Sequence, residues 1–296
     1  MSETRSAESD KHQNPTEKEE WVVITGCSSG IGLDCADRLL ALNYQVIATV
    51  RKESDQARLF NQGFKHVLVF DLSVAEEVDA ASSQIGTITK GKLKAVFNNA
   101  AYGQAGAVED LDRTTLERQF AVNVFGTHQL TRNLLPYLRA HGKGVIIQNS
   151  SVLGFCAMPL RGAYNASKFA LEGLSDTLRL ELMRNNDSVR IALIEPGPIT
   201  SQFRTNSLKA LKENVNISGS RYAKTYSEAI ARLSKPGPAS SFTLPASAVS
   251  DRVVEILNVR HPRRRYFVTA PTYVFAWLRR VLPTFILDRL LIKAGS

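Results

Sequence analysis

The 296-residue sequence contains only three cysteines, Cys27, Cys35 and Cys156, and no CxxC pair. This scarcity excludes a disulfide-stapled scaffold and a cysteine-ligated metal centre, and it indicates reduced thiols. The middle of the sequence also lacks a Pro-rich or Ser-rich linker, and no internal repeat is visible. We therefore expect one domain, which at 44% hydrophobic residues can bury a sizeable core.

Large apolar side chains are absent from residues 2–20. Such a segment cannot bury enough surface to offset the entropy of ordering, so we expect residues 1–20 to form a disordered tail. The tail lacks the apolar core of a secretion signal, which predicts a cytoplasmic protein. We expect a catalytic domain over residues 21–265, with a substrate cap at about 202–246, and an apolar and basic extension over residues 266–296.

The formal net charge is +9, and eight basic residues but only one acid, Asp288, follow from Arg260 onward. A basic excess of this kind can attract phosphorylated cofactors, anionic lipid or nucleic acid, or it can be a solvated face. Nucleic-acid binding would require a recognition helix or a stacking platform, and the sequence shows neither. We therefore expect no nucleic-acid partner.

Six apolar, β-branched runs occupy residues 21–25, 44–50, 66–73, 93–100, 144–151 and 189–197. Polar or helix-compatible stretches separate them. Near-continuous Val and Ile runs that alternate with helices predict a parallel sheet covered on both faces. The predicted fold class is α/β, a single doubly wound sheet of the Rossmann type with a C-terminal substrate cap.

A glycine loop joins the first predicted strand to the first predicted helix. Glycine is required there because the backbone must turn tightly and approach a pyrophosphate, whose charge the helix N-terminus then receives. A glycine cluster can also be a simple turn, but the flanking strand and helix favour nucleotide binding. The residues assigned to this loop are Gly26, Ser28, Ser29, Gly30, Ile31 and Gly32.

The spacing TGxxxGIG over residues 25–32 resembles the short-chain dehydrogenase/reductase family. Further parts of the family pattern follow in order: Asn98-Asn99-Ala100 ends the fourth strand, Asn123 lies in the next helix, Ser151 ends the fifth strand, and Tyr164-x-x-x-Lys168 comes after it. The resemblance covers residues 21–203 and departs from the family at position 101, an alanine where glycine is usual. It implies a Rossmann-type oxidoreductase that uses a nicotinamide cofactor.

The catalytic tetrad implied by this pattern is Asn123, Ser151, Tyr164 and Lys168. Tyr164 and Lys168 are four residues apart and so share one helix face. An ammonium near the phenol would lower its pKa from about 10, which makes Tyr164 the expected proton donor. Ser151 can hold the substrate carbonyl. The resemblance assigns Asn123 to a water that relays protons from Lys168.

The end of the second strand predicts the choice of cofactor. An acid there would bind the ribose hydroxyl of NAD, whereas arginine accommodates the 2'-phosphate of NADP. The sequence has Arg51 followed by Lys52, so we expect NADP(H), with Ser29 as a second phosphate partner and Lys52 as solvated surface.

Two later segments resemble further cofactor contacts of the family. Asp71 and Leu72 resemble the pair beside the adenine, although Asp71 could also be an ordinary strand-ending aspartate. Residues 195–201 resemble the loop at the nicotinamide. That likeness assigns Pro196, Gly197, Ile199 and Ser201 to the cofactor, with Thr200 as the alternative to Ser201.

The substrate is expected to be a small apolar carbonyl or alcohol. Phe155, Met158, Pro159 and Leu160 fall between Ser151 and Tyr164, where the family shapes its substrate site, although core packing explains Phe155 equally well. The strings around the tetrad look like those of bacterial NADP-dependent aldehyde reductases and, more distantly, of retinol and hydroxysteroid dehydrogenases. A non-catalytic NADPH-sensing protein is the rival reading, and the intact tetrad argues against it.

Residues 272–293 interleave aromatic and aliphatic side chains with Arg279, Arg280, Arg289 and Lys293. This pattern is typical of an interfacial amphipathic helix and predicts peripheral membrane contact. The longest uncharged stretch, 13 residues, is too short for a membrane span. Packing on the domain or at a subunit interface is the alternative. The family resemblance further implies a homodimer or homotetramer.

Overall fold

The computed structural model describes residues 20–234, 237–238 and 240–295, so the expected tail lies outside them except for Glu20. Its strands form one seven-stranded sheet in the order β3-β2-β1-β4-β5-β6-β7, with every neighbouring pair parallel. The strands are β1 Trp21–Ile24, β2 Gln45–Val50, β3 His66–Val69, β4 Ala95–Asn98, β5 Val145–Asn149, β6 Arg190–Glu195 and β7 Arg265–Phe267. The chain order reverses between β1 and β4, which is where open α/β sheets bind ligands.

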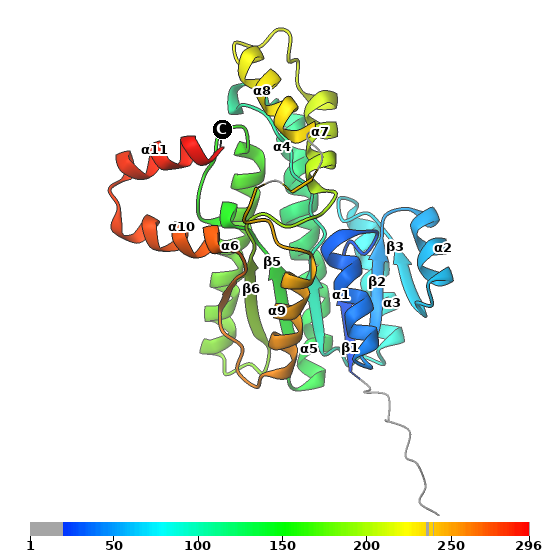
Figure 1. Cartoon of the computed structure of the whole chain (residues 1–296). Coiled ribbons are helices and arrows are strands. Elements are labelled where there is room, and N and C mark those ends of the chain that lie inside the picture. Colours follow the sequence, from blue (N-terminus) through cyan, green and yellow to red (C-terminus); the bar gives the residue numbers. More distant parts are fainter. Residues whose placement is uncertain (1–19, 235–236, 239, 296) are drawn as a thin grey trace, which may run out of the picture.

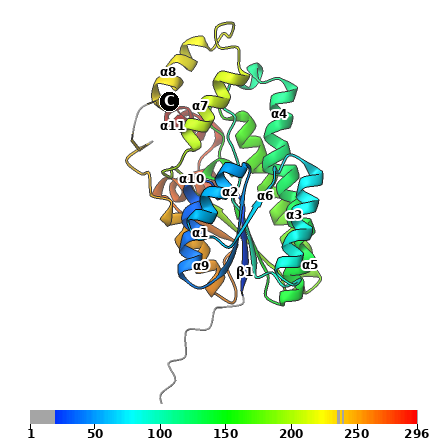
Figure 2. The same ribbon diagram turned by 90° about the vertical axis from the view of Figure 1, so that its right-hand side faces the viewer.

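Helices cover both faces of the sheet (Figure 2). One face packs against α1 Gly30–Ala41, α2 Glu53–Asn61 and α9 Ser247–Asn258, and the other packs against α3 Ala75–Ile88, α5 Thr127–His141 and α6 Gly162–Arg184. Because both faces are covered, the central strands are almost entirely buried, as their apolar runs require. The predicted doubly wound α/β fold is confirmed.

The cap stands over the carboxyl ends of the strands (Figure 1). It consists of α7 Phe203–Asn214 and α8 Ala223–Ser234, which face α4 Arg113–Phe120 and the short 3-10 helix η1 Val108–Asp110. Tyr226 of α8 is fully buried, and its hydroxyl donates to Asp110 Oδ2 (2.6 Å) and accepts from Ala107 N (2.8 Å). This tyrosine therefore fastens the cap to the loop that follows β4.

The C-terminal segment begins inside the sheet. Strand β7 pairs with β6, and Tyr266 is 2% exposed. The sheet therefore runs past residue 265, where the catalytic domain was expected to end. Helices α10 Ala270–Val281 and α11 Thr284–Gly295 follow as an arm on the side of the domain (Figure 1). Within the described ranges, no helix has both the length and the apolar character to cross a membrane.

Candidate active site

A cavity of about 890 Å³ opens at the carboxyl ends of the strands. Its wall begins at the glycine loop after β1 and passes the ends of β2, β3, β4, β5 and β6. The cap and α10 complete it. The predicted site residues that line the cavity are Gly26, Ser28, Ser29, Gly30, Ile31, Arg51, Asp71, Leu72, Asn99, Ser151, Tyr164, Lys168, Pro196, Gly197, Ile199 and Ser201.

The glycine loop has the backbone geometry that its sequence predicts. Gly26 and Gly30 have φ of +74° and +60°, a region where a side chain is strained. A Cβ on Gly30 would lie 3.2 Å from Cβ of Ser201, so the loop faces the segment after β6.

Gly32 differs from its assignment, because it does not line the cavity. A Cβ there would lie 2.3 Å from Gly26 O and 2.7 Å from Asn99 Nδ2. The role of Gly32 is thus close packing of α1 beneath the loop.

Arg51 lies exposed at the end of β2 and lines the cavity. Arg58 of α2 holds the glycine loop from behind, because its Nη2 donates to Ser28 O (2.6 Å) and to Asp55 Oδ1 (3.2 Å), but it does not line the cavity. The sequence did not single out Arg58, since the prediction considered only the residues directly after the strand.

One oxygen of the Asp71 carboxylate is already hydrogen-bonded within the protein, because Oδ1 accepts from Ser73 N (2.8 Å) and Ser73 Oγ (2.7 Å).

Asn99 fastens three strand ends together. Its Nδ2 donates to Thr25 O, and its Oδ1 accepts from Asn149 Nδ2, both at 2.9 Å. The side chain is thereby committed to β1 and β5, so Asn99 shapes the cavity by holding its wall. Thr25 and Asn149 belong to the same network and were not singled out from the sequence, since buried polar residues at strand ends carry no motif of their own.

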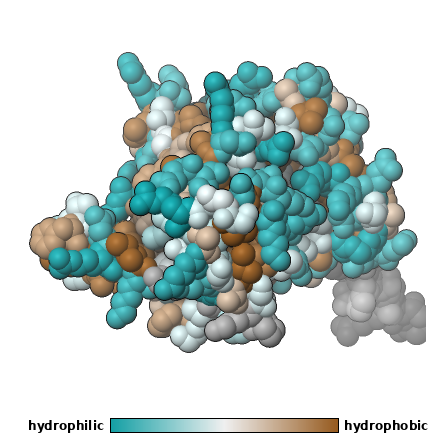
Figure 3. All heavy atoms as spheres, turned by 90° about the horizontal axis from the view of Figure 1, so that it is seen from above, coloured by the Kyte–Doolittle hydropathy of each residue, from teal (hydrophilic) through white to brown (hydrophobic). Residues whose placement is uncertain are grey.

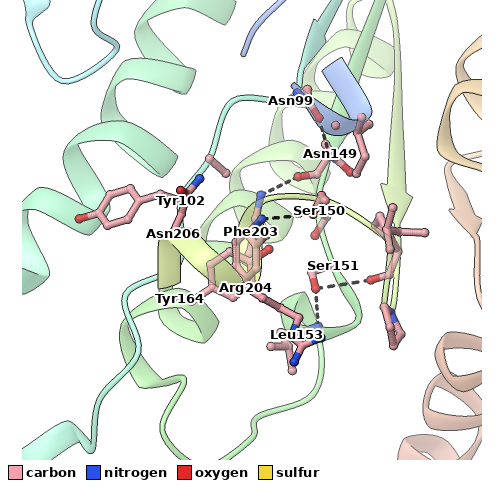
Figure 4. A pocket seen from close by; sticks show the side chains of 18 of the residues that line it. Asn99, Tyr102, Asn149, Ser150, Ser151, Leu153, Tyr164, Phe203, Arg204 and Asn206 are labelled. Carbon is pink, nitrogen blue, oxygen red and sulfur yellow. Dashed lines mark hydrogen bonds between the residues drawn. The ribbon is translucent and has the colours of Figure 1, made fainter. Parts of the chain in front are cut away.

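Ser151, Tyr164 and Lys168 all line the cavity beside β5. Figure 4 shows Ser151 and Tyr164 there. Ser151 Oγ accepts from Leu153 N (3.1 Å) and lies 3.5 Å from Pro196 O. Lys168 Nζ lies 5.7 Å from the centroid of the Tyr164 ring and donates to Asn149 O (2.6 Å). The predicted shared helix face on α6 therefore brings phenol and ammonium together.

The electrostatics of this pair differ from the expectation. Burial raises the pKa of Tyr164 to about 12, against lowering by the Ser151 hydroxyl and the Arg161 charge. The net shift is opposite to the predicted lowering, because burial of the phenol outweighs the groups that lower its pKa. Burial lowers the pKa of Lys168 to about 8, although the nearby Glu172 carboxylate opposes that shift.

Asn123 lies behind the cavity wall and not in it. It is 1% exposed and sits in a π-helical turn, η2 Ala121–Gly126, between α4 and α5. Its Oδ1 accepts from Tyr102 N (3.2 Å), and its Nδ2 donates to Tyr102 O and Ser167 Oγ, both at 3.1 Å. The side chain thus ties the loop after β4 to α6, and π-turns of this kind are frequent at functional sites.

A buried acid cluster underlies Lys168. Glu172, one turn further along α6, lies 2.9 Å from Arg265 Nη2, and the fully buried Glu195 lies 2.8 Å from Arg265 Nε. Asp176 Oδ2 accepts from the same Nη2 at 2.7 Å. Burial raises the pKa of both Glu172 and Glu195. The sequence reading missed this cluster, because its members come from α6, β6 and β7.

The cavity that holds Tyr164 is lined by apolar side chains, among them Met158 and Phe203, and by the basic side chains of Arg161, Arg204 and Arg232. The Phe203 ring, from the start of α7, lies 5.1 Å from the Tyr164 ring and covers it (Figure 4). Of the expected lining, Met158 reaches the cavity, whereas Pro159 and Leu160 do not. Phe155 packs 6.0 Å from the Phe267 ring, which favours the core reading of that residue.

The segment after β6 meets the cavity as expected, with Ser201 and not Thr200 on the wall. Thr200 N donates to Leu244 O (2.9 Å), which pins Thr200 to the loop before α9. Ala101, the departure from the family pattern, also lines the cavity.

These features define an oxidoreductase of the Rossmann type with a Ser-Tyr-Lys centre. The short chain dehydrogenase family matches residues 20–212, so the chain belongs to that family. It is 41% identical over 270 residues to the uncharacterized oxidoreductase YbbO of Escherichia coli, covering 91% of this chain and 93% of that one.

Two further proteins are similar. The NADPH-dependent 3-dehydrocapnine reductase of Ornithobacterium rhinotracheale is 33% identical over 283 residues, covering 92% and 96% of the two chains. A short-chain dehydrogenase/reductase of Burkholderia phymatum, solved in complex with NAD, superposes with a TM-score of 0.72 at 24% identity, covering 88% and 92%. That likeness shows the fold.

Proposed function

We propose that the protein is an NADPH-dependent reductase of aldehydes or ketones on apolar molecules, working in reverse as an alcohol dehydrogenase. The observation that carries the proposal is that a single continuous cavity contains both parts of the site. The glycine loop and Arg51 line one part of it, and Ser151, Tyr164 and Lys168 line the other. The first part fits a dinucleotide phosphate and the second fits a carbonyl. The similar 3-dehydrocapnine reductase is itself NADPH-dependent by name.

The residues present fit the cofactor. Positive-φ glycines at the N-terminus of α1 let backbone amides approach a pyrophosphate. Arg51 brings positive charge for a 2'-phosphate, and residues 196–201 would face the nicotinamide. When bound there, NADPH supplies a hydride to the substrate carbon.

The chain's own residues handle the carbonyl oxygen and its proton. Ser151 Oγ orients the oxygen, and Tyr164 donates the phenolic proton to it. A Tyr164 pKa of about 12 keeps the phenol protonated at neutral pH, which suits reduction. Lys168, with a pKa of about 8, can return a proton to this site near neutral pH. The Phe203 ring, 5.1 Å from the Tyr164 ring, shields one side of the phenol from solvent.

NADPH oxidation measured over a series of aldehydes of increasing chain length tests the proposal. Tyr164→Phe should lower kcat by about 10² to 10⁴ while leaving NADPH affinity unchanged, because the ring that packs in the cavity remains. The value of kcat/KM should rise with chain length. Unchanged turnover in Tyr164→Phe would refute the proton-donor role.

The cofactor assignment has its own control. Arg51→Ala should raise KM for NADPH and leave KM for NADH unchanged, since only NADPH carries the 2'-phosphate. A wild-type enzyme that uses NADH as well as NADPH would overturn the assignment without touching the catalytic one.

A further inference from the structure

The arm formed by α10 and α11, residues 270–295, leaves large apolar side chains in solvent. Trp277, Val281 and Phe285 are 62%, 50% and 62% exposed. Trp277 and Val281 are four residues apart and share one face of α10. Figure 3 shows hydrophobic atoms on the projecting arm beside hydrophilic ones. Soluble monomers rarely group exposed apolar side chains in this way, so we infer a partner for this face.

Cations accompany the apolar face. The arm carries Arg280, Arg289 and Lys293 against the single acid Asp288, whereas the guanidinium of Arg279 packs over the Phe169 ring of α6 at 5.7 Å. Arg289 follows Phe285 by four residues on α11, so the guanidinium and the ring project from the same side. Long basic side chains can keep their charge in a polar headgroup layer while neighbouring rings enter the acyl boundary.

We propose that the arm docks on an anionic membrane surface. Charge complementarity favours lipid, because an anionic leaflet attracts clustered basic residues. A second copy is disfavoured, since a two-fold interface through this face would bring two sets of basic residues together with only Asp288 of each copy to offset them. The indole of Trp277 also suits the boundary between headgroups and acyl chains, where one part of the ring is apolar and its N–H meets water.

The same arm forms part of the catalytic cavity. Ala270, Pro271, Val274 and Phe275 of α10 line it, together with Ala294 of α11. Val274 is also 51% exposed, so the docking face continues into the cavity wall. An apolar carbonyl compound dissolved in the bilayer would therefore reach Tyr164 without crossing bulk water. This access route rests on the proposed reductase function, whereas the docking itself does not.

Co-sedimentation of the full chain with phosphatidylcholine vesicles, with and without phosphatidylserine, tests the docking. We expect binding that depends on phosphatidylserine and weakens about fivefold for each of Arg280→Gln and Arg289→Gln. The double variant Trp277→Ser/Phe285→Ser should lose binding. Phe125→Ser is the matched control, because Phe125 is an aromatic residue of similar exposure, 61%, outside the arm.

Light scattering on the same variants separates lipid from a second copy. The proposal is overturned if the wild type does not sediment with anionic vesicles, or if the double variant sediments equally well. It is also overturned if light scattering shows that the wild type is a dimer that does not bind vesicles, and that the double variant is a monomer. Because sedimentation needs no turnover, its failure is distinct from failure of the reductase assay. Urea unfolding of each variant reports that it has folded.

Discussion

Replacing Gly32 by alanine tests whether this glycine packs α1 under the loop. The added Cβ would lie 2.3 Å from Gly26 O, where ordinary contact begins at 3.4 Å. The loop or the helix must therefore yield by about 1 Å, and overpacking of this kind costs about 1–3 kcal/mol. Gly26 belongs to the proposed pyrophosphate loop, so a shift of this size can lower kcat/KM by about 100-fold.

Gly173→Ala is the matched control. Gly173 also lies in a helix, but a Cβ there meets nothing within 4 Å. Its alanine should stabilise the protein by up to about 1 kcal/mol through helix propensity. Urea unfolding measures the free energy of unfolding of both variants. We expect that of Gly173→Ala to be higher than that of Gly32→Ala by about 1–3 kcal/mol or more. If Gly32→Ala matched the control in stability and the wild type in kcat/KM, the packing argument would be refuted.

Two other substitutions test buried polar groups. Burial raises the pKa of Glu195 from 4.5 to about 8, so between these values the folded state keeps a proton that the unfolded state loses. The free energy of unfolding therefore falls as pH rises from 4.5 to about 8. Glu195→Gln cannot ionise, and its melting temperature should fall less between pH 5 and 8; parallel curves would exclude the effect. Tyr226→Phe leaves Ala107 N–H without its acceptor and should cost about 1–3 kcal/mol, measured by urea unfolding, and an unchanged midpoint would show that the cap is fastened elsewhere.

The sequence predicted the sheet well, because buried parallel strands read as apolar runs and glycine spacing marks the turn after β1. It predicted the meeting of Tyr164 and Lys168, since four-residue spacing fixes both on one helix face. A late strand was expected within residues 266–293 but was placed beyond the domain, because nothing in the local sequence shows that it pairs with β6. The pKa of Tyr164 was predicted in the wrong direction, because burial depends on Phe203 and other residues that are distant in the sequence.

The segment after residue 264 has a larger part in the site than a terminal extension would. Arg265, the first residue of β7, holds the buried carboxylates of Glu172 and Glu195, and Glu172 in turn acts on the Lys168 charge. The same segment also contributes to the cavity, because residues of α10 line its wall. Removing the whole segment would disturb the acid cluster, the cavity wall and the proposed membrane face together. Point substitutions can separate the contribution of the arm from that of the strand, because Trp277 belongs to the arm and Glu195 is the β6 partner of Arg265 in β7.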